Sequence, residues 1–218
     1  MRKLASDLDR AAKILVMVIL TVLFIFIALF FNTKVAGSFE GWVYSESIEH
    51  MSPAVTLCAK VITHLGDTLA VLLVCLFLLI VPTLRKNYAA PVIASTVLAA
   101  SLNALLKLAF TRPRPDILRL IAETDFSFPS GHAMINMALY GAIVILAWRF
   151  LQTKRMKIAI TAGLTILVFA IGFTRVYLGV HYITDVIAGW CLGLAFAVGV
   201  ILVFDEIKRK SRCNEVGK

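Results

Sequence analysis

Six apolar runs divide the chain, and polar or charged residues bound each of them. The runs cover residues 14–31, 68–84, 89–106, 133–150, 158–173 and 186–204. Each is close to the ~20 residues that a helix needs to cross ~30 Å of hydrocarbon, at about 1.5 Å per residue. The pattern predicts an all-α integral membrane bundle of six transmembrane helices, forming a single domain over residues 1–218.

The longest polar connection, residues 32–67, contains a shorter helical pattern. Apolar residues follow Pro53 at helical spacing, and the aromatic residues Phe39 and Trp42 lie upstream. We expect two short helices at the outer surface of the membrane, with aromatic side chains at headgroup depth. A lid, a packing element and a route for lipid access are all compatible with this segment.

The composition argues against a soluble helical protein. Of the 218 residues, 60% are hydrophobic and 16% are charged, whereas soluble domains have roughly a quarter of their residues charged. Six apolar runs leave too little polar chain to cover them in water. Basic residues precede the first run, as in a secretory signal, but no small-residue cleavage site lies near its end at Phe31, which favours a retained span.

The net charge of +9 is distributed unevenly along the chain. If the amino terminus is cytoplasmic, 15 of the 22 lysines and arginines fall in cytoplasmic segments. This excess predicts that both termini lie on the cytoplasmic side of the membrane. We expect the basic carboxy-terminal tail to contact anionic lipid and not nucleic acid.

The first chemical cluster lies on the predicted outer side. Lys107 ends the third run, and Arg114 with Pro115 follows shortly after. Arginine donates two parallel hydrogen bonds to an oxyanion, and lysine adds a point charge. The alternative is that these side chains only reach lipid headgroups.

The second cluster immediately precedes the fourth run. Ser130 is a good N-cap, and the free N–H groups of a helix start bind anions. Gly131 allows the backbone to approach a ligand closely. His132 in the first turn would then face the bound anion as a proton donor.

The third cluster joins the last two runs. Arg175 ends the fifth run, and His181 and Asp185 are four residues apart, so on a helix they share one face. Asp185 could accept the Nδ1–H of His181 and leave Nε2 free to attack as a nucleophile. The alternatives are a polar pair that fastens the helix start, or a metal-chelating pair; no third ligand with suitable spacing is present, so we expect no metal and no cofactor.

These residues resemble the signature of the type 2 phosphatidic acid phosphatase family. Its three motifs are Lys-x6-Arg-Pro, Pro-Ser-Gly-His and Ser-Arg-x5-His-x3-Asp, and they occur here in the same order with one change, Thr174 for the usual serine. The resemblance implies that His181 attacks phosphorus, Asp185 orients it and His132 protonates the leaving oxygen. It also implies that the phosphoryl oxygens are held by Lys107, Arg114, Ser130, Gly131 and Arg175.

The resemblance therefore implies a metal-independent lipid phosphatase that spans the bacterial plasma membrane several times, with its active site at the outer face. Small bacterial members of this family, which this chain resembles most, act on undecaprenyl diphosphate, phosphatidylglycerophosphate or phosphatidate, and the sequence does not distinguish among these substrates. The family is also similar to vanadium-dependent haloperoxidases. A lipid or anion transporter or binding protein that retains the phosphate clamp without turnover is the alternative, and the oligomeric state is not predicted.

Overall fold

The computed structural model describes residues 2–116 and 118–216, with side chains described for 7–116 and 118–211. The described elements are α1 (Arg2–Phe30), α2 (Lys34–Glu49), α3 (Pro53–His64), α4 (Thr68–Ile80), α5 (Pro82–Leu84), the π-helical turn η1 (Arg85–Ala89), α6 (Ala90–Phe110), α7 (Gly131–Phe150), α8 (Lys154–Tyr177) and α9 (Ile183–Val216). The all-α prediction is confirmed. The predicted contact of the basic tail with lipid stays a prediction: Lys208, Arg209 and Lys210 are described, whereas the side chains of Arg212 and Lys218 lie outside the described part.

Within this described chain, five helical stretches are long and apolar enough to cross a membrane. They are Asp7–Phe30, Pro82–Phe110, Gly131–Phe150, Lys154–Tyr177 and Ile183–Ser211. A sixth span exists only if α3 and α4, which bend by 45° at the break between them, count as one.

The second predicted span, residues 68–84, therefore has different bounds in the structure. Helix α4 has 13 residues and ends at Ile80, so it covers only about 20 Å. Val81 is extended because the following Pro82 disfavours a helical conformation at the residue before it. The predicted connection at residues 85–88 is also helical, as the turn η1 leading into α6.

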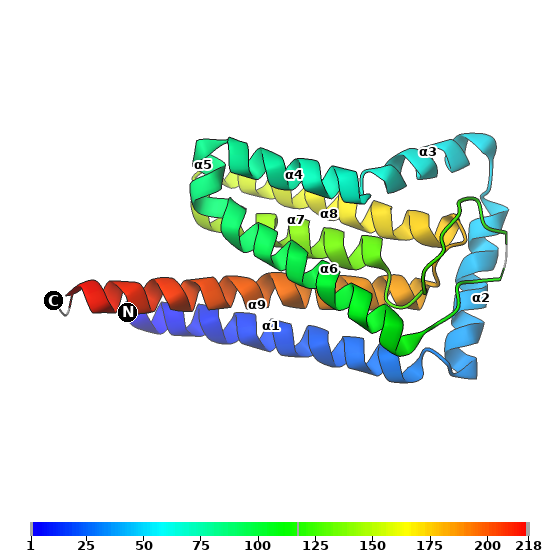
Figure 1. The fold of residues 1–218 in the computed structure, drawn as a ribbon, viewed down its shortest axis with the longest axis horizontal. Coiled ribbons are helices and arrows are strands. Elements are labelled where there is room, and N and C mark those ends of the chain that lie inside the picture. Colours follow the sequence, from blue (N-terminus) through cyan, green and yellow to red (C-terminus); the bar gives the residue numbers. More distant parts are fainter. Residues whose placement is uncertain (1, 117, 217–218) are drawn as a thin grey trace.

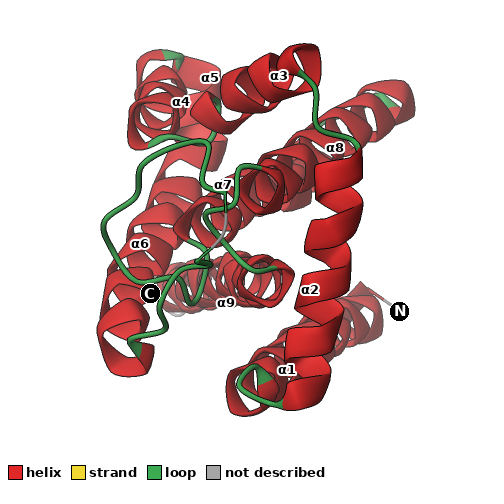
Figure 2. Cartoon of the chain, turned by 90° about the vertical axis from the view of Figure 1, so that its right-hand side faces the viewer, coloured by secondary structure: helices red, strands yellow, loops and turns green. Residues whose placement is uncertain are grey.

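The bundle is built around α7 and α9. Helix α7 packs against α6, α8 and α9, and α9 also packs against α1. The start of α1 and the end of α9 lie at one end of the bundle, and α2 lies across the other end (Figure 1). The view toward that end shows α2 and the long connection between α6 and α7 covering it (Figure 2). Of the two helices expected at the surface, α2 lies across the bundle, whereas α3 bends into α4.

Glycines allow α7 and α9 to pack closely. A Cβ atom on Gly193 would lie 2.3 Å from the carbonyl oxygen of Met134, and one on Gly189 would lie 2.8 Å from that of Ser130. Side chains at either position would therefore push the two helices apart. The Gly189 contact fixes the start of α7, which carries the second sequence cluster, against α9.

We predict that Gly193→Ala lowers the thermal stability of the detergent-solubilised protein. The added methyl collides with backbone, and overpacking of this kind costs typically about 1–3 kcal/mol. The matched control is Gly163→Ala on α8, where a Cβ meets nothing within 4 Å. That control should be neutral or stabilising, since alanine favours helix; equal stability of the two variants would contradict the close packing.

Candidate active site

The three sequence clusters meet at the end of the bundle that α2 covers. Helices α6 and α8 end there, and α7 and α9 begin there (Figure 1). One pocket of about 400 Å³ is lined by six of the predicted residues, namely Lys107, Arg114, Gly131, His132, Arg175 and His181. The other two, Ser130 and Asp185, are completely buried.

Arg114 reaches this pocket because the chain leaves α6 abruptly. Thr111, with φ 46°, ends α6 in the left-handed region. The Arg114 guanidinium donates from Nη1 to the carbonyl of Val180 at 2.7 Å and from Nε to the carbonyl of Asp125 at 2.8 Å. These bonds hold the cation in a buried position against the segment that carries His181.

Two carboxylates accompany the three cations of the pocket. Asp125 accepts hydrogen bonds from both Lys107 and Arg114. Glu123 pairs with Arg175 and also lies 3.6 Å from Arg114. Neither acid belongs to one of the three motifs, so neither was predicted to be part of the site. The cluster retains one net positive charge, and a tetrahedral oxyanion would compete with these carboxylates for the same donors.

The pKa values of the two acids reflect these contacts. Burial on its own would raise the pKa of Asp125, but the hydrogen bonds from Lys107 and Arg114 outweigh it and lower the pKa to about 2. Burial on its own would also raise the pKa of Glu123, but the charge and hydrogen bond of Arg175, together with the charge of Arg114, outweigh it and lower the pKa. Both side chains are therefore ionised at neutral pH.

His181 is buried, with its two ring nitrogens in different environments. Its Nε2 lies 3.2 Å from Nη1 of Arg114, so in the neutral ring this nitrogen accepts and Nδ1 carries the proton. Burial lowers the pKa of His181 to about 4, although Asp185 opposes the shift. The imidazole is therefore neutral at pH 7, with an unprotonated Nε2 on the pocket side.

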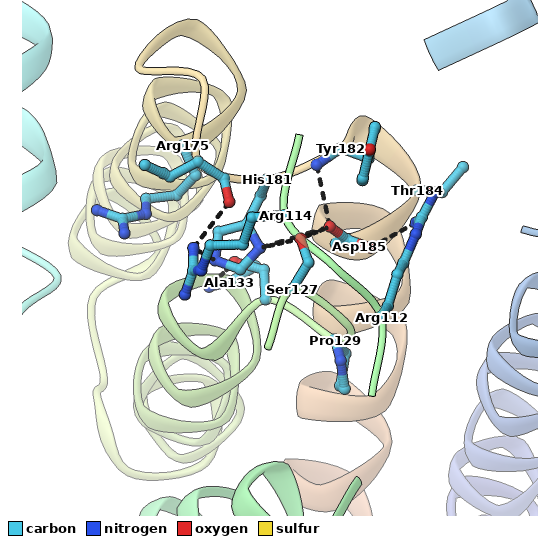
Figure 3. Close-up of polar contacts among 12 residues, drawn as sticks. Arg112, Arg114, Ser127, Pro129, Ala133, Arg175, His181, Tyr182, Thr184 and Asp185 are labelled. Atoms are coloured by element: carbon cyan, nitrogen blue, oxygen red, sulfur yellow. Dashed lines mark hydrogen bonds and ion pairs between the residues drawn. The ribbon is translucent and has the colours of Figure 1, made fainter. Parts of the chain in front are cut away.

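The expected direct bond between His181 and Asp185 is replaced by a bridge. The Nδ1 atom lies 3.5 Å from Oδ2 of Asp185 but 3.3 Å from Oγ of Ser127, which donates to Oδ2 at 2.5 Å (Figure 3). Helix α9 begins only at Ile183. His181 therefore precedes the regular helix, and the i, i+4 geometry that the spacing predicts does not apply.

Asp185 is surrounded by donors. Besides Ser127, it accepts from Nη1 of Arg112 at 2.6 Å and from the backbone N–H of Tyr182 at 2.9 Å (Figure 3). Because a buried carboxylate without partners is costly, these bonds stabilise its ionised form. Arg112 and Ser127 were not among the predicted site residues; the repeated Arg-Pro at residues 112–115 was the available signal for Arg112.

His132 is held by a carboxylate from the break between α3 and α4. Its Nε2 lies 2.8 Å from Oδ1 of Asp67, and Nδ1 of His64 lies 2.7 Å from the other oxygen of Asp67. His64 belongs to none of the three motifs, so no motif indicated this contact. Asp67 sits at the N-cap of α4 without capping it, because its side chain turns to the two histidines.

The start of α7 has the predicted capping geometry. Ser130 is the N-cap, and its hydroxyl accepts from the N–H of Ala133 at 3.5 Å. A Cβ on Gly131 would lie 3.1 Å from Oδ1 of Asn103, whose Nδ2 donates to the carbonyl of Pro129 at 3.1 Å. Gly131 thus allows the turn to pack against α6 while one face of it lines the pocket.

Two further findings concern residues of the motifs and metal ligands. The hydroxyl of Thr174 donates to the carbonyl of Ile171 at 2.7 Å, so the replacement of serine leaves a local hydrogen bond within α8. Among the described side chains, those of residues 7–116 and 118–211, no three or more histidine, cysteine or acidic groups lie together as metal ligands. The donors around the pocket instead suit an oxyanion held by arginine and lysine.

Sequence comparisons find related proteins that match part of the chain. The sequence is 41% identical over 112 residues to phosphatidylglycerophosphatase B of Bacillus subtilis (strain 168), covering 50% of this chain and 54% of that protein. It is 40% identical over 84 residues to an undecaprenyl-diphosphatase of Sulfolobus acidocaldarius, covering 38% and 36%. The chain thus spans about half the length, or less, of these curated relatives.

A solved structure and a family match extend the comparison. The fold is similar to the crystal structure of a transmembrane PAP2 type phosphatidylglycerolphosphate phosphatase from Bacillus subtilis, with a TM-score of 0.80 and 28% identity over 88% of this chain and 98% of that one. The sequence model of the PAP2 superfamily matches residues 88–209, which contain all three motifs and all eight predicted site residues. Because that match covers more than half of the sequence, the chain belongs to the PAP2 superfamily.

Proposed function

We propose that this membrane protein is a lipid phosphatase that removes a phosphate from a phosphomonoester or diphosphate headgroup through a phosphohistidine. The observation that carries the proposal is the environment of His181 Nε2. It belongs to a neutral imidazole and lies in a pocket with Lys107, Arg114 and Arg175. Membership of the PAP2 superfamily and the phosphatase names of its relatives support the same chemistry.

The shape of the pocket supports a substrate with an apolar chain. Beyond the charged end, its wall consists of apolar side chains from α4 and α6, among them Val71, Leu72, Ile93 and Val97. A phosphate could bind the cations while the hydrocarbon lies between these two helices. Undecaprenyl diphosphate, phosphatidylglycerophosphate and phosphatidate all have this form, and the pocket does not select among them.

The proposed reaction has two steps. Nε2 of His181 attacks phosphorus, the bond from phosphorus to the leaving oxygen breaks, and His132 donates a proton to that oxygen. Water then attacks the phosphohistidine, His132 accepts a proton from the water, and the P–N bond breaks to release phosphate. The charge on the phosphoryl oxygens is neutralised by three cations, Lys107, Arg114 and Arg175. Ser130 and Gly131 help to hold the same oxygens at the start of α7. Asp185 orients His181.

We further propose that the site faces the outer side of the membrane, in a single-domain protein with both termini in the cytoplasm. The site lies at the end of the bundle opposite the start of α1 and the end of α9 (Figure 1). Basic residues that the sequence assigns to the cytoplasmic side, such as Lys13 and Arg149, belong to helix ends near the termini. This distribution supports the orientation.

The direct test is phosphate release by the purified protein in lipid nanodiscs, with undecaprenyl diphosphate, phosphatidylglycerophosphate and phosphatidate offered separately and in competition. Release from at least one of them is expected. Tight binding of these lipids without any release would support the transporter or binding-protein alternative and overturn the proposal.

His181→Ala should abolish phosphate release, because the variant lacks the attacking nitrogen. Arg114→Ala should leave a trace of activity, since loss of one such donor typically costs about 10²–10³ in rate. The matched control is His50→Ala, an exposed histidine on the same face of the protein. Turnover by His181→Ala at the wild-type rate would reject the nucleophile assignment.

The acid limb of kcat/KM should lie near pH 4. The attacking imidazole must be neutral, and because the pKa of His181 is lowered to about 4 from 6.5, it stays neutral down to that pH. Activity should therefore fall only as the pH drops through about 4. The profile should be measured with a substrate whose phosphate does not ionise near pH 6.5. An acid limb near pH 6.5 would then contradict this environment for His181.

Asp125→Asn should strengthen inhibition by inorganic phosphate. The carboxylate competes with phosphate for Lys107 and Arg114, and its removal frees both donors. Since Asp125 is half exposed, the effect on the inhibition constant should be modest, about two- to fivefold. Asp116→Asn, a change in the same connection away from these cations, is the control; weaker inhibition in Asp125→Asn would show that Asp125 organises the cations instead.

A further inference from the structure

Arg112 has more buried polar contacts than its place outside the three motifs suggests. Its side chain is only 6% exposed and lies between two acids. Nη2 donates to both carboxylate oxygens of Glu40 at 2.8 and 2.9 Å, and Nη1 donates to Asp185 at 2.6 Å and to Thr184 at 2.9 Å. One guanidinium therefore binds a carboxylate on each side.

Two aromatic rings also lie against the same guanidinium. Its central carbon lies 4.5 Å from the ring centroid of Phe31 and 4.0 Å from that of Tyr182. Such stacking, together with the planar fork, restricts the orientation of an arginine in a way that a lysine could not reproduce. Arg112 thus connects the end of α1, helix α2 and the start of α9.

The position of Arg112 determines that of Asp185. The Oδ1 atom of Asp185 is bound by Arg112, and its Oδ2 atom is bound by Ser127 and the N–H of Tyr182. Ser127 in turn lies 3.3 Å from Nδ1 of His181. A continuous chain of contacts therefore runs from Glu40 on α2 to the ring of His181.

We propose that Arg112 is a positioning residue, which Glu40 anchors and which holds Asp185 and Ser127 so that His181 keeps its proton on Nδ1 and its Nε2 toward the pocket. The effect on catalysis rests on the proposed function, in which His181 is the nucleophile. Helix α2 thereby gains a role, because its Glu40 holds Arg112 in place. Glu40, Asp185 and Arg112 together carry one net negative charge. This charge would balance the positive charge of the imidazolium ring that forms on attack.

The test uses two variants and two remote controls. Glu40→Gln keeps the shape of the acid and removes its charge; Arg112→Lys keeps the charge and removes the fork. Glu49→Gln is an exposed change on the same helix. Arg149→Lys removes another arginine with bonds of 2.5 Å to both oxygens of an aspartate, Asp205, at the other end of the bundle.

We expect kcat to fall about tenfold in Glu40→Gln and about 10- to 100-fold in Arg112→Lys, with KM within about threefold of wild type, because the support of the nucleophile changes and the phosphate ligands do not. The controls should keep the wild-type kcat. Lower thermal stability with an unchanged kcat, measured well below the unfolding temperature, would show a purely structural role and overturn the proposal.

A second readout does not depend on turnover. With selective ¹⁵N labelling of the four histidines, the Nδ1–H proton of His181 should give a signal protected from exchange with water in the wild type and both controls. Its exchange should be at least tenfold faster in Glu40→Gln. This result tests the proposal even if Arg112→Lys does not fold. Unchanged protection would overturn the positioning role, whereas a wild-type protein that releases no phosphate would overturn only the proposed function.

Discussion

The burial of one ionised carboxylate, that of Asp185, determines much of the architecture at the covered end of the bundle. Asp185 is fully buried, and its two oxygens need donors that the start of α9 cannot supply alone. Arg112 and Ser127 come from the connection between α6 and α7, and Arg112 is itself held by Glu40 of α2. Satisfying this single group therefore ties a connection and a surface helix to the segment that carries His181.

Two acids partly offset the positive charge of the pocket. Three buried cations at one end of a membrane bundle would repel one another if no acid were near. Glu123 and Asp125 lie in the same connection as Arg114 and reduce this repulsion. The pocket thus keeps its cations close together and aimed at one space, which is the arrangement that stabilises charge on a phosphoryl group without reorganisation.

Much of the membrane bundle could be predicted from local sequence, because hydrophobic length is a local property. The second span is the exception: the apolar run continues through residues 81–84, but Pro82 ends the helix, and hydrophobicity alone does not register that break. The identity of the pocket residues was likewise available from three motifs. Their placement in one pocket required the tertiary packing of α6, α7, α8 and α9.

The partners of those residues could not be predicted in the same way. Arg112 and Glu40 are 72 positions apart, and His132 and Asp67 are 65 apart, so no local spacing signals either pair. The four-residue spacing of His181 and Asp185 predicted a direct hydrogen bond between them, but only if His181 belongs to the helix. Because α9 begins two residues later, Ser127 occupies the bridging position between the two side chains.

The central claim is that Nε2 of His181 accepts the phosphoryl group. The most direct measurement is rapid-quench trapping with a phosphorus-32-labelled lipid phosphate, stopped in alkali because the P–N bond of phosphohistidine is labile in acid, followed by mapping of the labelled peptide. The account predicts label on His181 that appears before free phosphate and disappears with turnover. Label on another residue, or the release of phosphate with no labelled protein under conditions in which the second step is slow, would contradict it.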